Sequence, residues 1–183
     1  MSDGRPSWDT WGIGLAHAVA ERADCTRRAV GAVLMSPDHS IVSTGYNGGP
    51  PKGPSCLKGE CPRGLASQEE IPGYDSVGKA LGAVAQDDWE KISGSGATSY
   101  DIGPGACIAL HAEQNALLRA TWDEMRDSTL YVTCKPCPGC IRMICGTHID
   151  RVVWYIDPEQ VGIARIRGGR FIEDAFTRVR SLR

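Results

Sequence analysis

HAE at residues 111–113 and PCPGC at residues 136–140 are the two segments around which the rest of this sequence can be interpreted. The first supplies the imidazole of His111, and the second supplies the thiols of Cys137 and Cys140. One nitrogen and two sulfurs leave the fourth position of a tetrahedral metal ion open for water, which is typical of a catalytic zinc site. Glu113 is then free to transfer protons.

Both segments lie where a helix is expected to begin. Residues 110–120 are rich in Ala and Leu and predict one helix, and residues 137–145 predict the next. The positive end of a helix dipole favours thiolates, and the C-x-x-C spacing places both sulfurs on the first turn. We therefore expect the three ligands to converge from two adjacent helix N-termini.

Each segment alone has an ordinary explanation. A C-x-x-C pair also occurs in thioredoxin-like redox sites and as half of a structural zinc site, and a single His at a helix start is more often a cap. Together and in this order, H-x-E followed by P-C-x-x-C is the signature of zinc deaminases. The pattern predicts water activated by zinc attacking a ring amidine carbon, with Glu113 transferring protons to the ring nitrogen and the leaving ammonia.

The composition favours one ordinary globular domain. A chain of 183 residues that is 42% apolar and 23% charged can build a full hydrophobic core. We expect a single domain over residues 1–183, with an insertion at about residues 65–105, where the composition changes. A formal charge of −2 offers no electrostatic footprint for a long nucleic acid, whereas a few arginines suffice for a small anionic substrate.

The sequence also indicates a compartment. Residues 1–10 lack the charged start and apolar core of a secretory signal, and no apolar run reaches membrane-spanning length. We expect a cytoplasmic protein without a membrane partner. Eight cysteines are many for a reducing compartment, so metal binding explains them better than disulfides do.

The N-terminal part predicts a helix and a hairpin. Residues 8–22 place apolar side chains at helical spacing, and residues 30–35 and 41–46 are short β-branched runs joined by a four-residue turn. Residues 47–64 are dense in Gly and Pro and predict an irregular loop. Within the insertion, residues 76–91 predict a further helix.

The C-terminal part predicts an alternation of strands and helices. We expect strands at residues 129–134 and 151–155 and a final amphipathic helix at residues 170–182. With the two helices described above, this order favours an α/β sandwich around a mostly parallel sheet, with the hairpin at its antiparallel edge.

Three separated segments resemble the deoxycytidylate (dCMP) deaminases. HAEQNAL (111–117) is similar to their active-site helix, CTRRAVGAVLMSPDHSIVSTGYNGG (25–49) to their opening hairpin and loop, and TLYVTCKPCPGC (129–140) to their second metal segment. The resemblance covers most of residues 8–156 apart from the insertion. It implies the cytidine deaminase-like fold, a three-layer α/β/α sandwich with a five-stranded mixed sheet. It also implies a zinc cofactor and the hydrolysis of dCMP to dUMP and ammonia.

Two alternatives to this function remain open. The catalytic residues are common to the superfamily, so a related modified nucleotide, a nucleoside or a free base is a second candidate substrate. The alternative from another class is a catalytically silent, zinc-stabilised binding module. Glu113 argues against such a module, because a structural metal site needs no carboxylate at that position.

Three residues near the opening hairpin are candidate substrate contacts. Asn47 follows the second strand, where a carboxamide can bond to both a sugar hydroxyl and a base edge; in similar deaminases the matching Asn contacts substrate. Arg27 and Arg28 are candidate phosphate contacts by charge. A Gly-rich turn for Asn47 and a solvated surface for each arginine are the ordinary alternatives.

The resemblance also implies partners. Many members of the family are hexamers regulated by deoxynucleoside triphosphates, through a region that includes the Gly-Tyr-Asn-Gly loop. We therefore expect a homo-oligomer, a hexamer being the family's common form, and a nucleoside triphosphate effector. The long insertion, and Cys134 in a position where an acidic or apolar residue is usual, depart from the family pattern.

Four further cysteines suggest a second metal. Cys56 and Cys61 have metal-ligand spacing, Cys107 lies just before the helix that bears His111, and Cys25 lies near the first strand. Some relatives bind a structural zinc in this region. We expect these four thiols to hold a structural zinc that ties the insertion to the core, the alternative being buried free cysteines. Cys134 and Cys145 are expected to be ordinary core residues.

Overall fold

The computed structural model describes residues 4–65, 107–174 and 176–178. By its internal contacts the chain divides into two compact units, Met1–Asp24 with Arg28–Gly48 and Leu110–Arg183, and Cys25–Arg27 with Gly49–Ala109. The insertion, its expected helix at residues 76–91 and most of the second unit lie outside the described residues. The expectation of a single domain with an insertion stays a prediction.

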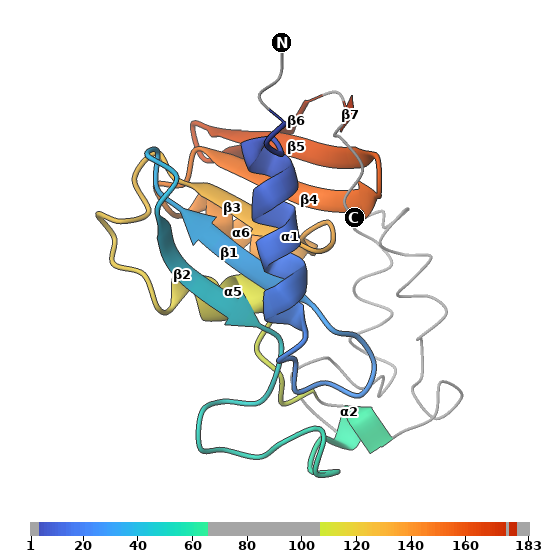
Figure 1. Cartoon of the computed structure of the whole chain (residues 1–183). Coiled ribbons are helices and arrows are strands. Elements are labelled where there is room, and N and C mark those ends of the chain that lie inside the picture. Colours follow the sequence, from blue (N-terminus) through green and yellow to red (C-terminus); the bar gives the residue numbers. More distant parts are fainter. Residues whose placement is uncertain (1–3, 66–106, 175, 179–183) are drawn as a thin grey trace, which may run out of the picture. The chain divides into compact units, whose positions relative to one another are not determined.

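The first unit is built on a mixed sheet in the order β2-β1-β3-β4-β5-β6, with β7 paired to β5 (Figure 1). The strands are β1 (Gly31–Met35), β2 (Ile41–Tyr46), β3 (Thr129–Val132), β4 (Arg151–Asp157), β5 (Gln160–Arg167), β6 (Arg170–Glu173) and β7 (Thr177–Arg178). Its helices are α1 (Trp8–Ala20), α5 (Ala112–Leu117) and α6 (Pro138–Cys145). The expected opening helix, hairpin and two ligand-bearing helices are all present, with shifted ends.

Three layers of structure enclose two apolar cores, as expected. Helix α1 covers one face of the sheet, while α5 and α6 cover the other (Figure 1). Alternate residues of β1 divide between the cores, because successive side chains of a strand point to opposite faces. Val33 packs with Ile13 and Ala16 of α1, whereas Leu34 packs with Ala116 and Ile144 of the other helices.

Two details of the predicted sheet were wrong. It has seven strands among the described residues and not five, and β3 and β4 form its one parallel pair there. Strand β6 also replaces the start of the helix predicted at residues 170–182, and β7 occupies residues 177–178. Gly168 and Gly169, with φ of 55° and 70°, form the two-residue turn between β5 and β6. Consecutive residues at positive φ are typical of a hairpin turn and are incompatible with a helix.

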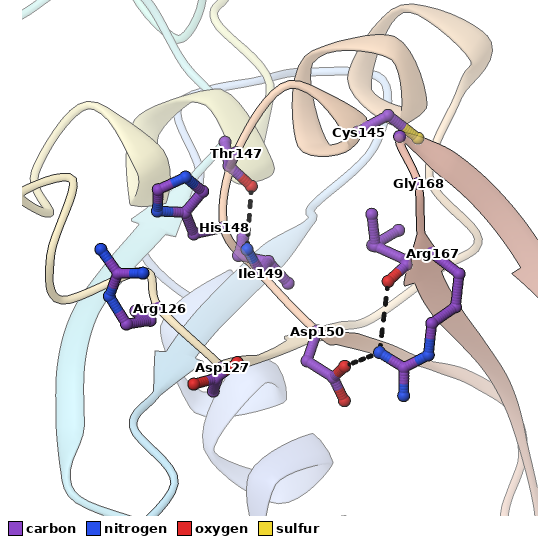
Figure 2. Close-up of a pocket in the computed structure, with 11 residues that line it drawn as sticks. Arg126, Asp127, Cys145, Thr147, His148, Ile149, Asp150, Arg167 and Gly168 are labelled. Carbon is purple, nitrogen blue, oxygen red and sulfur yellow. Dashed lines mark hydrogen bonds and ion pairs between the residues drawn. The ribbon is translucent and has the colours of Figure 1, made fainter.

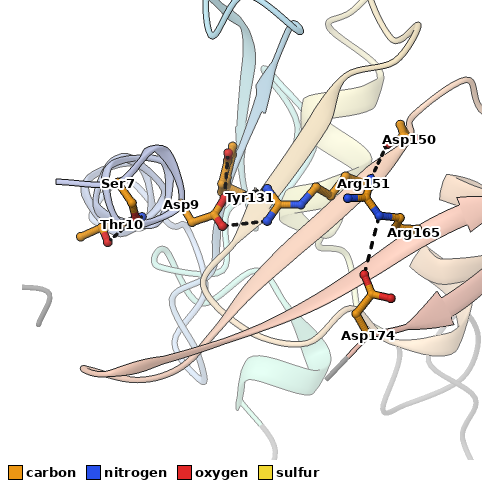
Figure 3. Close-up of polar contacts among 8 residues, drawn as sticks. All are labelled: Ser7, Asp9, Thr10, Tyr131, Asp150, Arg151, Arg165 and Asp174. Carbon is orange, nitrogen blue, oxygen red and sulfur yellow. Dashed lines mark hydrogen bonds and ion pairs between the residues drawn. The ribbon is translucent and has the colours of Figure 1, made fainter. Parts of the chain in front are cut away.

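A half-buried ion pair attaches α1 to the centre of the sheet. Arg151, the first residue of β4, donates two hydrogen bonds to the Asp9 carboxylate, at 2.6 and 2.7 Å. The Tyr131 hydroxyl of β3 donates to the same carboxylate at 3.2 Å (Figure 3). Burial raises the pKa of Tyr131, so the phenol keeps its proton. Because the Arg–Asp contact is bidentate and mostly shielded, it fixes the start of α1 in direction as well as position.

The described part of the second unit is a loop with one short helix. Helix α2 (Pro62–Leu65) follows Cys61 directly, and Thr26 bonds across to Cys56 and to Gly64 within the unit. None of the helices in the described ranges, in either unit, has the length and apolar character needed to cross a bilayer.

Candidate active site

The three predicted ligands converge in the first unit. The Nδ1 atom of His111 lies 3.5 Å from the sulfur of Cys137 and 3.4 Å from that of Cys140. All three donor atoms lie within 4.8 Å of one another. With Zn–N and Zn–S bonds of ordinary length, tetrahedral geometry requires an N···S separation of about 3.6 Å. The donor set and its spacing therefore fit a tetrahedral zinc ion held by three protein ligands.

Local sequence places each ligand at a helix start. His111 is the N-cap residue of α5, and its backbone N–H donates to the Gln114 side chain at 2.7 Å. Cys137 caps α6 and its sulfur accepts from the backbone N–H of Cys140 at 3.5 Å, with Pro138 as the first residue of the helix. The missing N–H of a proline costs nothing at that position, so the turn is well formed for C-x-x-C.

The two thiols share a proton. The hydrogen bond from the Cys140 thiol, together with that from His111, lowers the pKa of Cys137 to about 3. The same bond to Cys137, with burial, raises the pKa of Cys140. One thiolate is therefore available without a cation, and a bound zinc ion would displace the second proton, since it binds sulfur as thiolate.

Glu113 lies beside the ligands, on the first turn of α5. It is 3% exposed. Burial raises its pKa, while His111 opposes the shift and Cys137 reinforces it. Its carboxylate lies within hydrogen-bonding reach of the Cys140 thiol. A carboxyl group that is shielded from solvent, adjacent to a metal site and not needed as a ligand is suited to proton transfer.

Comparison with known proteins agrees with this arrangement. The model of the family described as "Cytidine and deoxycytidylate deaminase zinc-binding region" matches residues 6–156. A deoxycytidylate deaminase of Mycobacterium phage D29 is 37% identical over 150 residues, which are 82% of this chain and 95% of the relative. The chain belongs to this deaminase family.

Two more distant members show different extents of similarity. A deoxycytidylate deaminase of Schizosaccharomyces pombe is 32% identical over 152 residues, which are 82% of this chain and 38% of the yeast protein. A dCMP deaminase from the cyanophage S-TIM5, solved in complex with dCMP and dUMP, is 22% identical over 82% of each chain, with a TM-score of 0.49.

Asn47, the residue predicted to contact substrate, is 8% exposed, and its side chain is hydrogen-bonded to the backbone. Its Oδ1 accepts from the Val30 N–H at 2.8 Å, and its Nδ2 donates to the Arg28 carbonyl at 2.7 Å. An amide group has two donor hydrogens and two lone pairs on its oxygen, so each of these atoms retains capacity for a second partner.

The two candidate arginines lie in different units. Arg28 is exposed in the first unit, and its charge lowers the pKa of the Cys134 thiol. The charges of Glu113 and Cys137 raise the pKa of the same thiol. Arg28 is thus electrostatically linked to the neighbourhood of the metal site. Arg27 belongs to the second unit, where its Nε donates to the Arg63 carbonyl at 2.8 Å.

Cys134, predicted to be an ordinary core residue, is half-buried, and the charges of Glu113 and Cys137 act on its thiol. Burial raises its pKa; Arg28 lowers it, and Glu113 and Cys137 raise it further. Its position three residues before Cys137 and two residues after the end of β3 is the sequence signal for this proximity.

The four remaining predicted ligands, Cys25, Cys56, Cys61 and Cys107, all belong to the second unit, and among the described residues only His111, Cys137 and Cys140 form a group of three closely spaced candidate ligands. Burial raises the pKa of Cys56, and the charges of Cys61 and Cys25 add to this effect. Burial likewise raises the pKa of Cys107, again with Cys61 and Cys25 as neighbours. The thiols of Cys56 and Cys107 both hydrogen-bond Cys61.

A separate cavity of about 260 Å³ lies at the other end of the first unit (Figure 2). It opens beside Asp127, which precedes β3, Asp150, which precedes β4, and Cys145, the last residue of α6. The ligands Cys137 and Cys140 lie at the opposite end of α6. Figure 2 shows the Arg167 guanidinium pointing toward the Asp150 carboxylate, with which it forms an ion pair. This ion pair neutralises two of the charged side chains that line the cavity.

Proposed function

We propose that this chain hydrolyses dCMP to dUMP and ammonia. The observation that carries the proposal is the convergence of His111, Cys137 and Cys140 beside a buried Glu113. The similarity to a phage deoxycytidylate deaminase over nearly the whole of that relative supports the choice of dCMP.

The residues divide the chemistry between them. Zinc, held by His111, Cys137 and Cys140, would supply the Lewis acid that makes water nucleophilic at neutral pH. Glu113 takes a proton from the attacking water and delivers it to the ring nitrogen, and it then takes the proton of the new hydroxyl at C4 of cytosine and delivers it to the amino group. The new C–O bond replaces the C–N bond, and the amino group leaves as ammonia. Glu113 can do this repeatedly because each turnover returns it to its starting protonation state.

Asn47 and the arginines are proposed to select the nucleotide. Asn47 retains one donor hydrogen and one lone pair with which to contact the sugar and the base, and it lies on the loop next to Leu110, the residue before His111. Arg28 is the better phosphate candidate, because it is exposed and interacts with Cys134 beside Glu113. We retain Arg27 as a second candidate by charge.

Ammonia release measured across dCMP, CMP, deoxycytidine, cytosine and the corresponding purines tests the substrate. We expect dCMP to give the highest kcat/KM, because both the phosphate and the base are recognised. Turnover of non-phosphorylated compounds alone would refute the mononucleotide assignment. Absence of turnover with every compound, at full zinc content, would indicate a zinc-stabilised binding module.

We also propose that Cys25, Cys56, Cys61 and Cys107 hold a second, structural zinc ion. The supporting observation is the pattern of hydrogen bonds around the sulfurs. Backbone N–H groups of Thr26 and Gly64 donate to Cys56 and Cys61 at 3.4 and 3.3 Å. Bonds from Ile108, Gly64 and the neighbouring thiols outweigh burial and lower the pKa of Cys61. Thiolates stabilised by backbone N–H groups are suited to zinc.

Metal analysis of the purified protein tests the second site. We expect about two zinc ions per chain in the native protein and about one in the double variant Cys56→Ser/Cys61→Ser. Cys145→Ser, which removes a thiol in the other unit, is the matched control and should leave both ions bound. A native content of one zinc that is unchanged in the double variant would refute the structural site.

Three broader expectations belong with this function. A cytoplasmic location suits eight cysteines of which none is paired in a disulfide, because a reducing compartment keeps thiols available to bind zinc. Assembly as a homo-oligomer, a hexamer being common in the family, and binding of a nucleoside triphosphate effector remain proposals. Mass measurement of the native protein with and without deoxynucleoside triphosphates tests both.

A further inference from the structure

The peptide group between Tyr46 and Asn47 is held from both sides. Its carbonyl oxygen accepts a hydrogen bond from Nδ2 of Asn115 at 2.8 Å. Its N–H donates to the Val30 carbonyl at 3.1 Å. Asn115 is 6% exposed, so the bond it makes is shielded from water. A peptide plane fixed at both ends sets the direction in which the next side chain, that of Asn47, leaves the backbone.

The loop that begins with Asn47 is joined to two functional segments. The Asn47 side chain bonds the backbone of Arg28 and Val30, as described above. Gly48 exchanges two backbone hydrogen bonds with Leu110, at 3.1 and 2.9 Å, immediately before His111. Small movements of this loop would therefore displace the groups that bind the nucleotide relative to the metal ligand.

Asn115 also belongs to the helix that carries the chemistry. Its backbone N–H donates to the His111 carbonyl at 3.0 Å, which places it one turn after the ligand and two residues after Glu113. Its side chain reaches from this helix to the end of β2. One residue thus spans the two groups of side chains that must be aligned for reaction.

We propose that Asn115 is a positioning residue that keeps Asn47 and Arg28 in register with His111 and Glu113. The expected effect of Asn115 on the kinetics of dCMP turnover rests on the proposed function. Its expected effect on the position of Asn47 does not. Asn115 touches neither substrate nor metal in this scheme, and it acts through the Tyr46 carbonyl.

Ser43 offers a matched control in the same pair of elements. Its hydroxyl donates to the Ala116 carbonyl of α5 at 2.8 Å, and it is 7% exposed. The bond therefore also joins β2 to α5 and is equally shielded. Ser43 lies three residues before Tyr46, about 10 Å along the strand from the loop. Ser43→Ala should lower stability as much as Asn115→Ala does without disturbing Asn47.

The first measurement is amide hydrogen exchange, which needs no substrate. Asn115→Ala should speed exchange at the Asn47 and Gly48 amides by about fivefold relative to Ser43→Ala, the factor that corresponds to one lost hydrogen bond. Asn115→Asp keeps the size of the side chain, removes its donor and should give the same acceleration. Equal exchange at these amides in the Asn115 and Ser43 variants would overturn the proposal.

The second measurement is the split between KM and kcat with dCMP. The Asn115 variants should raise KM by about tenfold and change kcat less, since Glu113 and the ligands are retained, while Ser43→Ala should leave both near the native values. Parallel changes in the Asn115 and Ser43 variants would refute a positioning role. Absence of dCMP turnover in the native protein would refute the proposed function alone, because the exchange experiment would still test Asn115.

Discussion

Replacing Glu113 with glutamine is expected to lower kcat for dCMP by about 10²–10⁴-fold, the range that general acid–base catalysis contributes. Glutamine has nearly the same shape, but it cannot accept a proton from water or return one to the ring nitrogen. Zinc content should stay at the native level, because His111, Cys137 and Cys140 are unchanged. Steady-state kinetics together with metal analysis of the same sample measures both quantities.

Glu159→Gln is the matched control for this prediction. It makes the same chemical change at an exposed residue in the turn between β4 and β5, so activity should be native. Native activity in Glu113→Gln, with full zinc content, would remove Glu113 from the mechanism. Zinc loss in that variant would instead show that the carboxylate supports the metal, contrary to the assignment of three protein ligands.

Replacing Gly45 with alanine is expected to lower the free energy of unfolding by about 3 kcal/mol, at the upper end of the usual cost of overpacking. A β-carbon at this position would lie 2.1 Å from the Ala112 carbonyl oxygen and 2.3 Å from the Ala116 nitrogen. Both atoms belong to the backbone of α5, so no change of rotamer relieves the clash. Either β2 or α5 must shift, and α5 begins beside the ligand His111.

Urea denaturation of Gly45→Ala against Gly14→Ala measures this effect. A β-carbon on Gly14, an exposed position of α1, would meet no atom within 4 Å. Alanine is the better helix former, so Gly14→Ala should stabilise the protein by up to about 1 kcal/mol. If Gly45→Ala unfolds at the native urea concentration, the close approach of β2 to α5 is incorrect.

The metal site could be predicted from the sequence because its determinants are local. C-x-x-C and a capped helix start fix where Cys137 and Cys140 lie relative to each other, and His111 is carried on a helix whose composition is equally clear. The three layers also follow from periodicity, since Val33 and Leu34 face opposite cores.

The errors and omissions arise where tertiary contacts or turn chemistry decide the outcome. Residues 170–182 have an amphipathic pattern, but Gly168 and Gly169 before them form a hairpin turn and make residues 170–173 a strand. The role inferred for Asn115 depends on Tyr46, 69 positions away along the chain, so no local pattern reveals it. The same limit applies to Cys134, whose neighbours include Arg28 from another part of the chain.

The contact between Cys61 and Cys107 affects where the chain can gain or lose residues. These thiols hydrogen-bond each other and lie on either side of residues 66–106. Only three residues separate Cys107 from the ligand His111. Insertions and deletions in this interval should therefore be selected against, because one residue more or less would displace the His111 imidazole from Cys137 and Cys140.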